Sequence, residues 1–194
     1  MMVLGLTGGI GMGKSHAATQ FRRLGIPIFD ADDTVHRLQS VRGRAVRPIG
    51  DAFPGTIANG GVNREALRQA VLGNPAALKR LERIVHPLVR SEERRFIQRC
   101  RRQGRRLVVL DIPLLFETGG DARCDVVVVV SAPAAVQRAR VLRRSGMTRE
   151  RLSAILARQM PDAEKQRRAD FVVRTGLSRG HATRAITRLL QSLR

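Results

Sequence analysis

Residues 8–15 read Gly8-Gly9-Ile10-Gly11-Met12-Gly13-Lys14-Ser15. They match the pattern G-x-x-x-x-G-K-[ST], the P-loop whose backbone amides cradle phosphate groups. The lysine of such a loop reaches the β- and γ-phosphates of a nucleoside triphosphate, and the serine hydroxyl faces Mg²⁺. The sequence therefore predicts a polyphosphate ligand close to its N-terminus.

The residues on either side of the loop predict a strand before it and a helix after it. Val3 to Thr7 form a short apolar run, and Ser15 to Leu24 have a helical pattern that ends at Gly25. A strand, a glycine-rich loop and a helix in this order aim a helix N-terminus at an anion. The alternative, a glycine-rich turn that binds nothing, does not explain these flanking elements.

Five apolar segments predict a parallel sheet. Each segment is a continuous hydrophobic run, which is typical of parallel strands covered on both faces. Helical stretches separate the segments, so we expect an α/β fold with a five-stranded parallel sheet flanked by helices. The predicted strands are residues 3–7, 26–29, 107–110, 126–130 and 171–173.

The connection between the second and third predicted strands is much longer than an ordinary crossover. It predicts a helical insertion, with helices that begin at Asn63 and at Asn74-Pro75. The His86-Pro87 pair predicts that the second of these helices ends there and that another runs on toward Gly104. At 194 residues the chain has the size of one domain with such an insertion.

We accordingly expect three parts. The nucleotide-binding core takes residues 1–33, 105–131 and 162–194, the helical acceptor domain takes residues 34–104, and a lid takes residues 132–161. In the lid, Pro133 opens one predicted helix and Thr148 caps another that runs to Met160.

The formal net charge is +20, so nucleic acid is the first partner to consider. The arginines are, however, spread along the whole chain without interleaved aromatics, and a composition bias or the attraction of polyanionic substrates explains them as well. We expect no specific nucleic-acid partner. Two cysteines without disulfide or metal spacing suit a reducing compartment, and we expect a cytoplasmic protein without a signal peptide or membrane span.

Three carboxylates follow the second predicted strand: Asp30, Asp32 and Asp33. In open α/β sheets, ligands bind at the edge where the strands end. A carboxylate there can accept the proton of an acceptor hydroxyl during phosphoryl transfer. Helix capping is the alternative, but three carboxylates in four positions are more than one cap requires.

Other candidates lie further along the chain. Asp111 follows a buried strand, as does the aspartate that supports Mg²⁺ in P-loop proteins. The segment Pro113 to Glu117 leaves this strand at the ligand edge, although its apolar residues could also be plain core. Arg140 shares a helix face with Arg144, and they are either lid arginines or part of a solvated charged face.

Taken together, the motifs resemble those of the dephospho-coenzyme A kinase family. L-T-G-G-I-G-x-G-K-S, D-A-D, H-P and P-L-L-F-E occur in the family's order and spacing, followed by an arginine-bearing lid and by A-D-F-V-V. The similarity extends over essentially the whole chain. It implies a fold like that of the P-loop nucleoside triphosphate hydrolases. It also implies an enzyme that uses ATP and Mg²⁺ to phosphorylate the ribose 3′-hydroxyl of dephospho-CoA.

The resemblance also implies roles for residues at matching positions. Asp32, the second aspartate of D-A-D, would be the catalytic base, and Lys14 would stabilise charge on the moving phosphoryl group. The ATP phosphates would be held by Gly11, Met12, Gly13, Lys14, Ser15, His16 and the lid arginine Arg140, with Ser15 on Mg²⁺. The acceptor pocket or its support would include Thr7, Asp32, His86, Leu114 and Glu117.

The sequence departs from the commoner family pattern at three places. Met12 stands where serine is frequent, His16 stands where threonine is frequent, and Arg174-Thr175-Gly176 replaces an asparagine-containing turn near the adenine of ATP. Alternatives are another P-loop kinase of small molecules or nucleotides and, from a different class, a nucleic-acid-binding ATPase. We favour a monomer.

Overall fold

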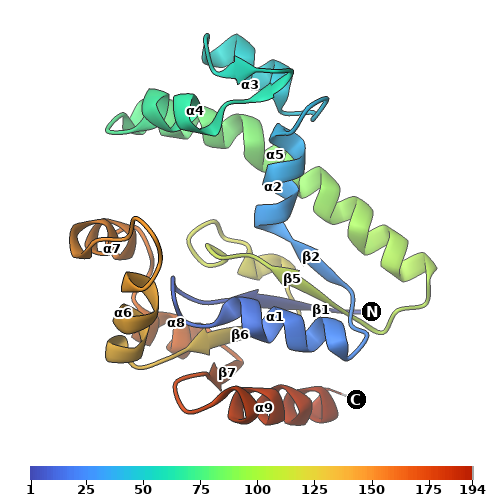
Figure 1. The fold of residues 1–194 in the computed structure, drawn as a ribbon. Helices are drawn as coiled ribbons and strands as arrows, with labels where there is room; N and C mark the ends of the chain where they lie inside the picture. The colour runs from blue at the N-terminus through green and yellow to red at the C-terminus, as the bar shows by residue number, and fades with distance from the viewer. Residues whose placement is uncertain (194) are drawn as a thin grey trace. The chain divides into compact units, whose positions relative to one another are not determined.

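The structure, a computed structural model, describes residues 1–193, and its chain divides into two compact units. One unit comprises Met1–Phe29 and the chain from Cys100 onward, and the other comprises Asp30–Arg99. The first unit is built on a five-stranded sheet, and the second consists of helices and one short hairpin (Figure 1).

The predicted parallel sheet is confirmed, in the strand order β2-β5-β1-β6-β7. Central β1 pairs in parallel with β5 on one side and with β6 on the other, and β6 pairs in parallel with β7. All five strands lie within a few residues of the predicted segments. Their bounds are Met2–Thr7 for β1, Ile28–Asp30 for β2, Leu107–Asp111 for β5, Val126–Ser131 for β6 and Phe171–Arg174 for β7.

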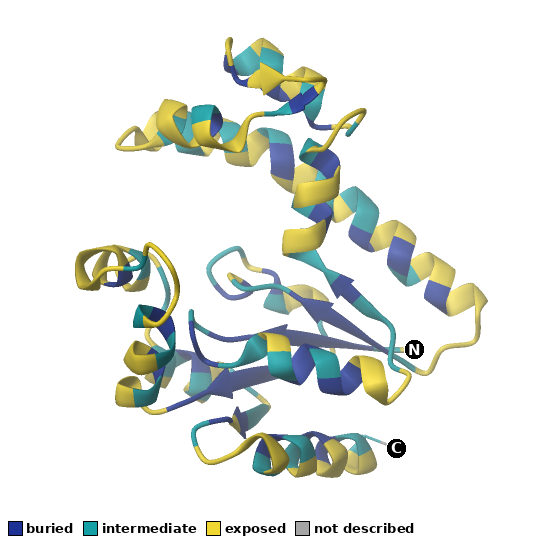
Figure 2. Ribbon diagram, viewed as in Figure 1, coloured by how far each residue is buried: buried dark blue, intermediate teal, exposed yellow. Residues whose placement is uncertain are grey.

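The two faces of the sheet are covered by different elements. α1 (Lys14–Arg23) and α9 (Arg179–Ser192) lie on one face, where Val128 and Val130 join their core (Figure 1). Val127 and Val129 point to the opposite face, because successive side chains of a strand alternate. Burial on both faces explains why the strands are continuous apolar runs (Figure 2).

The remaining helices of this unit are short. They are α6 (Ala134–Leu142), α7 (Arg149–Leu156), α8 (Asp162–Arg168) and the 3₁₀ helix η1 (Asp121–Arg123). Thr148 caps α7 as predicted, since its hydroxyl accepts a hydrogen bond from the Arg151 N–H. The helix predicted to run on to Met160 ends earlier, at Leu156, and α8 was not predicted.

The second unit has a core of its own. It contains α2 (Ala31–Gln39), α3 (Val46–Ala52), the hairpin of β3 (Ile57–Ala58) and β4 (Gly61–Val62), α4 (Arg64–Val71) and α5 (Pro75–Arg102), which runs past the unit boundary. Leu38, Ile49, Phe53, Leu67 and Val85 form its buried centre. Asn63 and Asn74 accept hydrogen bonds from the first turns of α4 and α5, as the sequence predicts.

The predicted helix break at His86-Pro87 is wrong, because α5 is continuous through Pro87. A proline inside a helix removes one hydrogen bond to the carbonyl four residues before it. Both Pro87 and Arg83, which carries that carbonyl, are exposed, so water can satisfy the carbonyl. Val85 and its apolar neighbours pack on one side and keep the helix intact. No helix among the described residues is both long and apolar enough to span a bilayer.

Candidate active site

The loop between β1 and α1 has the backbone geometry of an anion site. Gly11 and Gly13 have positive φ angles of 76° and 93°, which residues with a side chain rarely adopt. Gly13 caps α1 without a side-chain hydrogen bond, and the first turn of α1 holds no acidic residue. The His16 N–H donates to the Gly13 carbonyl at 3.0 Å, whereas the N–H groups of Lys14 and Ser15 have no acceptor among residues 1–193 and are available to a phosphate.

Lys14 and Asp111 meet at the carboxyl ends of neighbouring strands. Lys14 Nζ lies 2.6 Å from Asp111 Oδ1, and their side chains are 17% and 3% exposed. The pairing of β1 with β5 brings the two residues together, since the P-loop follows β1 and Asp111 ends β5. The P-loop lysine and the strand-end aspartate are therefore in direct contact.

The same place offers oxygen ligands suited to Mg²⁺. The exposed Ser15 carries a hydroxyl beside Lys14, and Asp111 supplies a carboxylate. Mg²⁺ in phosphate-transferring proteins is typically held by one or two protein oxygens together with substrate phosphates. Ser15 and Asp111 therefore fit this ion in their chemistry, and Asp111 contacts the residue next to Ser15.

The side chains of Arg140 and Thr175 donate hydrogen bonds to backbone carbonyls of the phosphate loop. Arg140 Nη2 donates to the Thr175 carbonyl at 2.7 Å, and Nη1 donates to Thr175 Oγ1 at 3.1 Å and to the Gly11 carbonyl at 3.4 Å. Thr175 Oγ1 in turn donates to the Met12 carbonyl at 2.6 Å. The guanidinium of Arg140 thus lies against the phosphate loop.

Two glutamines hold the tip of the loop at Ile10. The Ile10 N–H donates to Gln159 Oε1 at 3.1 Å, and the Ile10 carbonyl accepts from Gln137 Nε2 at 2.8 Å. The unusual Met12 is 3% exposed, and its sulfur accepts a hydrogen bond from the Ala132 N–H. Packing against the end of β6 therefore explains how a methionine fits in this loop. His16 lies in the first turn of α1, and its Nε2 is buried without a hydrogen-bond partner among the residues that the structure describes.

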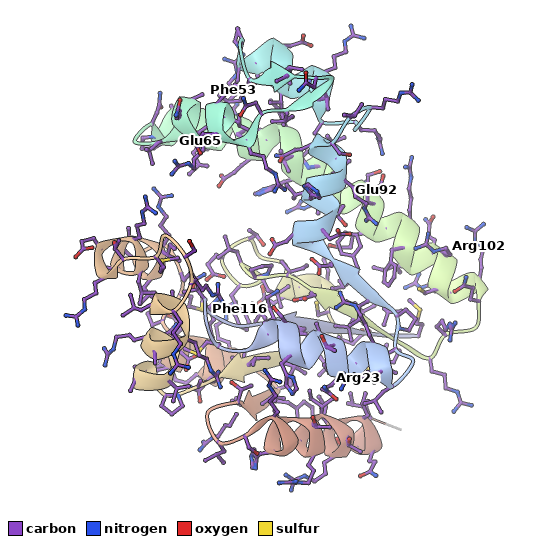
Figure 3. All side chains as sticks on the ribbon, in the orientation of Figure 1. Arg23, Phe53, Glu65, Glu92, Arg102 and Phe116 are labelled. Atoms are coloured by element: carbon purple, nitrogen blue, oxygen red, sulfur yellow. The ribbon has the colours of Figure 1, made fainter. Side chains whose placement is uncertain are left out.

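The segment that follows β5 is tied to β1 and to the core. Thr7 Oγ1 donates to the Pro113 carbonyl at 2.9 Å, and Leu115 and Phe116 are buried. Arg168 stacks over the Phe116 ring, with its guanidinium carbon 4.5 Å from the ring centroid. Figure 3 labels Phe116 among the side chains of this unit. Leu114, in contrast, is a large apolar side chain that remains 39% exposed. Core packing accounts for Leu115 and Phe116 but not for Leu114.

Glu117 is held by a buried lysine. Its Oε1 lies 2.8 Å from Lys165 Nζ and accepts a hydrogen bond from the Met160 N–H at 2.8 Å. Burial alone would raise the pKa of Glu117. The hydrogen bonds from Lys165 and from the Met160 N–H outweigh burial and hold that pKa below its ordinary value. Glu117 thereby links the segment after β5 to the start of α8.

The three aspartates after β2 have different surroundings within the second unit. Asp30 caps α2, because its carboxylate accepts a hydrogen bond from the Asp33 N–H at 3.1 Å. Asp33 pairs with Arg37 at 3.5 Å. Asp32 is exposed in the first turn of α2, and no hydrogen bond or ion pair engages its side chain among residues 1–193. His86, also in this unit, is exposed on α5.

Comparison with known proteins agrees with this geometry. The family profile described as dephospho-CoA kinase matches residues 2–178. The chain belongs to the dephospho-CoA kinase family. It is 63% identical over 166 residues to a dephospho-CoA kinase of Paramagnetospirillum magneticum, covering 86% of this chain and 78% of that protein. It is also 55% identical over 193 residues to that of Brucella melitensis, covering 100% and 96%.

Among solved structures, TT1252 from Thermus thermophilus superposes with a TM-score of 0.85 at 36% identity, over 100% of this chain and 98% of that one. This member of the dephospho-CoA kinase family therefore shares its fold with that solved structure along the whole chain.

In this dephospho-CoA kinase family member, sequence reasoning missed the residues that support the phosphate loop and Glu117 from distant positions in the chain. Gln137, Gln159 and Thr175 reach the loop from positions more than 100 residues away, and Lys165 reaches Glu117 across 48 positions of the chain. Only Thr175 carried a signal, because the turn 174–176 departs from the commoner family pattern. The others have polar side chains that are usual on a protein surface.

Proposed function

We propose that this chain transfers the γ-phosphoryl group of ATP to the ribose 3′-hydroxyl of dephospho-CoA, giving coenzyme A and ADP. The observation that carries the proposal is that the Asp32 carboxylate is exposed and has no hydrogen bond or ion pair among residues 1–193. Its two neighbouring aspartates have structural partners, whereas Asp32 is exposed and unengaged among the described residues directly after β2. A carboxylate with no structural task at a ligand-binding strand end is suited to act as a base.

On the donor side, the P-loop would hold the ATP phosphates. The N–H groups at the start of α1 and the ammonium group of Lys14 would stabilise negative charge on the phosphates as the γ-phosphoryl group moves. Ser15 and Asp111 would hold Mg²⁺, which neutralises phosphate charge when bound. Arg140, whose guanidinium reaches the Gly11 carbonyl, would add to this positive surface, and His16 in the first turn of α1 would lie beside the phosphates.

On the acceptor side, Asp32 would orient the 3′-hydroxyl and accept its proton. The ribose oxygen then forms a bond to the γ-phosphorus, the bond from that phosphorus to the β–γ bridging oxygen breaks, and ADP leaves with the electron pair. General-base assistance of this kind increases a reaction rate by about 10²- to 10⁴-fold.

Other residues would shape or support the acceptor pocket. The exposed apolar side chain of Leu114 is suited to contact an uncharged part of the acceptor, and the family resemblance adds His86. Thr7 and Glu117 would act as supports, because their polar atoms are engaged by Pro113, Met160 and Lys165. The division into a core, an acceptor domain over residues 34–104 and a lid over residues 132–161 is part of this proposal.

We further propose that the protein works in the cytoplasm as a monomer. Its substrates, ATP and dephospho-CoA, are small polyanions, and the formal charge of +20 favours their approach. No nucleic-acid partner is needed to explain the charge.

An acceptor-specificity assay tests the proposed reaction. ADP release is measured in a coupled assay with ATP, Mg²⁺ and either dephospho-CoA, AMP or adenosine, and the phosphorylated product is identified by mass and by its site of phosphorylation. We expect dephospho-CoA to be preferred and to be phosphorylated on the 3′-hydroxyl. A preference for AMP would instead indicate a nucleotide kinase, and ATP hydrolysis that requires DNA would indicate the nucleic-acid-dependent class.

A further inference from the structure

The hydroxyl of Thr175 lies at the junction of the sheet, the phosphate loop and α6. Thr175 directly follows β7 and is 6% exposed. Its N–H donates to the Ser131 carbonyl at 2.8 Å, which continues the pairing of β7 with β6. The side chain is therefore held in place by the sheet rather than by the loop that it contacts.

The hydrogen bond from Thr175 sets the orientation of one peptide group in the loop. Thr175 Oγ1 donates to the Met12 carbonyl at 2.6 Å. In a planar trans peptide the carbonyl and the following N–H point in opposite directions. The bond therefore turns the Gly13 N–H away from Thr175, and this N–H makes no hydrogen bond within residues 1–193.

The loop approaches Thr175 so closely at Gly13 that a side chain there would have almost no room. A Cβ atom on Gly13 would lie 3.0 Å from Thr175 Oγ1 and 3.2 Å from Thr175 Cβ. With a φ angle of 93°, this glycine can adopt a backbone conformation that lets the loop rest directly on the threonine. The threonine side chain and the missing glycine side chain are thus complementary in shape.

Thr175 also fixes the guanidinium of Arg140. Its hydroxyl accepts from Arg140 Nη1 at 3.1 Å and its carbonyl accepts from Nη2 at 2.7 Å. The hydroxyl has one proton, and the Met12 carbonyl at 2.6 Å is a much closer acceptor for it than the Ser131 carbonyl at 3.4 Å, while the oxygen accepts from Arg140. One side chain connects the arginine to the loop.

We infer that Thr175 is a positioning residue for the donor phosphates: its hydroxyl orients the Met12–Gly13 peptide and holds Arg140 against the loop. The residue acts through these groups and need not touch the nucleotide. The inference rests on the proposed use of ATP and concerns the donor site alone.

The test compares Thr175→Val, which keeps the shape but removes the hydroxyl, with Thr175→Ser, which keeps the hydroxyl. ATP affinity is measured directly by calorimetry, and KM values for ATP and dephospho-CoA are measured separately. We expect Thr175→Val to weaken ATP binding about 10-fold, because the buried Met12 carbonyl loses its partner. Thr175→Ser should stay within about 2-fold of the wild type, since it restores the same bond.

A matched control is Thr187→Val on α9. The Thr187 hydroxyl donates to the Thr183 carbonyl at 3.1 Å, and the residue is exposed. The variant should leave ATP affinity and both KM values unchanged. If valine at position 175 prevents folding, Thr175→Ala removes the same hydroxyl without adding bulk, and the same loss of ATP affinity is expected. Thermal unfolding shows which variants are folded.

Several results would overturn the inference. ATP affinity that is unchanged in Thr175→Val would show that the hydroxyl does not position the donor site. Equal losses in the valine and serine variants, or an equal rise of KM for dephospho-CoA, would indicate a general structural role. Wild-type protein that does not bind ATP would reject the proposed function itself, which the wild-type titration shows separately from the variants.

Discussion

Lys14 Nζ lies 2.6 Å from Asp111 Oδ1, so the phosphate loop after β1 and the carboxyl end of β5 meet in a nearly buried ion pair. The ammonium group is thereby held at the loop that would receive the ATP phosphates. Through this pair the Asp111 carboxylate contacts the residue that precedes Ser15, the proposed Mg²⁺ ligand of the loop. A single contact thus joins the charge-stabilising group to the candidate metal ligand.

Replacement of Asp111 by asparagine keeps the shape of the side chain and removes its charge. We expect kcat to fall about 100-fold or more, because the proposed oxygen donor for Mg²⁺ and the partner of Lys14 are both weakened. Loss of one partner of a fully buried ion pair destabilises by about 3–5 kcal/mol. Since Lys14 keeps partial access to water, we expect the free energy of unfolding, measured by urea denaturation, to fall by about 2 kcal/mol.

The control for this variant is Asp121→Asn. Asp121 pairs with Arg168 at 2.7 Å, but both side chains are partly exposed. Exposed pairs of this kind contribute about 0–1 kcal/mol, so activity and stability should change little. A fully active Asp111→Asn enzyme would remove this aspartate from the metal site.

The ion pair of Glu117 with Lys165 predicts a dependence of stability on pH. The pKa of Glu117 is lowered in the folded protein, so its contribution to stability is fully present above the ordinary carboxyl pKa of about 4.3. The contribution is lost as the pH falls through the lower folded value. Glu117→Gln should therefore be less stable than wild type at pH 7, and the difference should shrink below about pH 4.

This difference is measured by urea denaturation of both proteins from pH 7 down to pH 3. The comparison with the glutamine variant cancels the titration of the other carboxylates. Glu65→Gln is a matched control, because the pKa of Glu65 is also lowered, by its hydrogen bond with Arg68, yet both side chains are exposed. A stability difference for Glu117→Gln that does not vary with pH would contradict the proposed role of this charge.

The sheet and the helix caps could be predicted because each depends on a local signal. Val127 to Val130 form an unbroken apolar run because both faces of β6 are covered. Asn63 and Thr148 cap their helices with the side-chain oxygens that such positions favour. These patterns do not require knowledge of distant contacts.

The supports of the candidate site could not be predicted because their partners lie far away in the sequence. α8 reads Asp-Ala-Glu-Lys-Gln-Arg-Arg, which looks like a solvated segment, yet Lys165 within it is 1% exposed beside Glu117. A buried lysine has no local sequence signal. At Pro87 a strong local signal gave a wrong prediction. Packing of the apolar face of α5 outweighs the local preference for a helix break there.

The continuity of α5 predicts that Pro87→Ala is stabilising. Alanine supplies the missing N–H for a hydrogen bond to the Arg83 carbonyl and removes the steric conflict of the ring. Proline inside a helix is about 3 kcal/mol less favourable than alanine, and part of this is offset because proline also restricts the unfolded chain. We expect a gain of about 1–2 kcal/mol in the free energy of unfolding, measured by urea denaturation.

Leu88→Ala provides the comparison, since Leu88 packs against the core of the second unit and its truncation should be destabilising. A loss of stability in Pro87→Ala would mean that the helix does not run straight through this position in solution.

The contrast between Asp32 and Asp33 gives a direct test of the catalytic base. Asp32→Asn removes the group proposed to accept the proton, so kcat should fall about 100-fold or more, within the range for loss of a general base. Affinity for ATP should not change, because the donor site is built from other residues.

Asp33→Asn is the matched control, one position along the same helix, and it removes only an exposed ion pair with Arg37. Its kcat should stay within about 2-fold of wild type, as expected for so weak a contact. Both variants should unfold at the wild-type temperature, since neither side chain is buried. Undiminished turnover in Asp32→Asn, or an equal loss in Asp33→Asn, would exclude Asp32 as the base that deprotonates the acceptor.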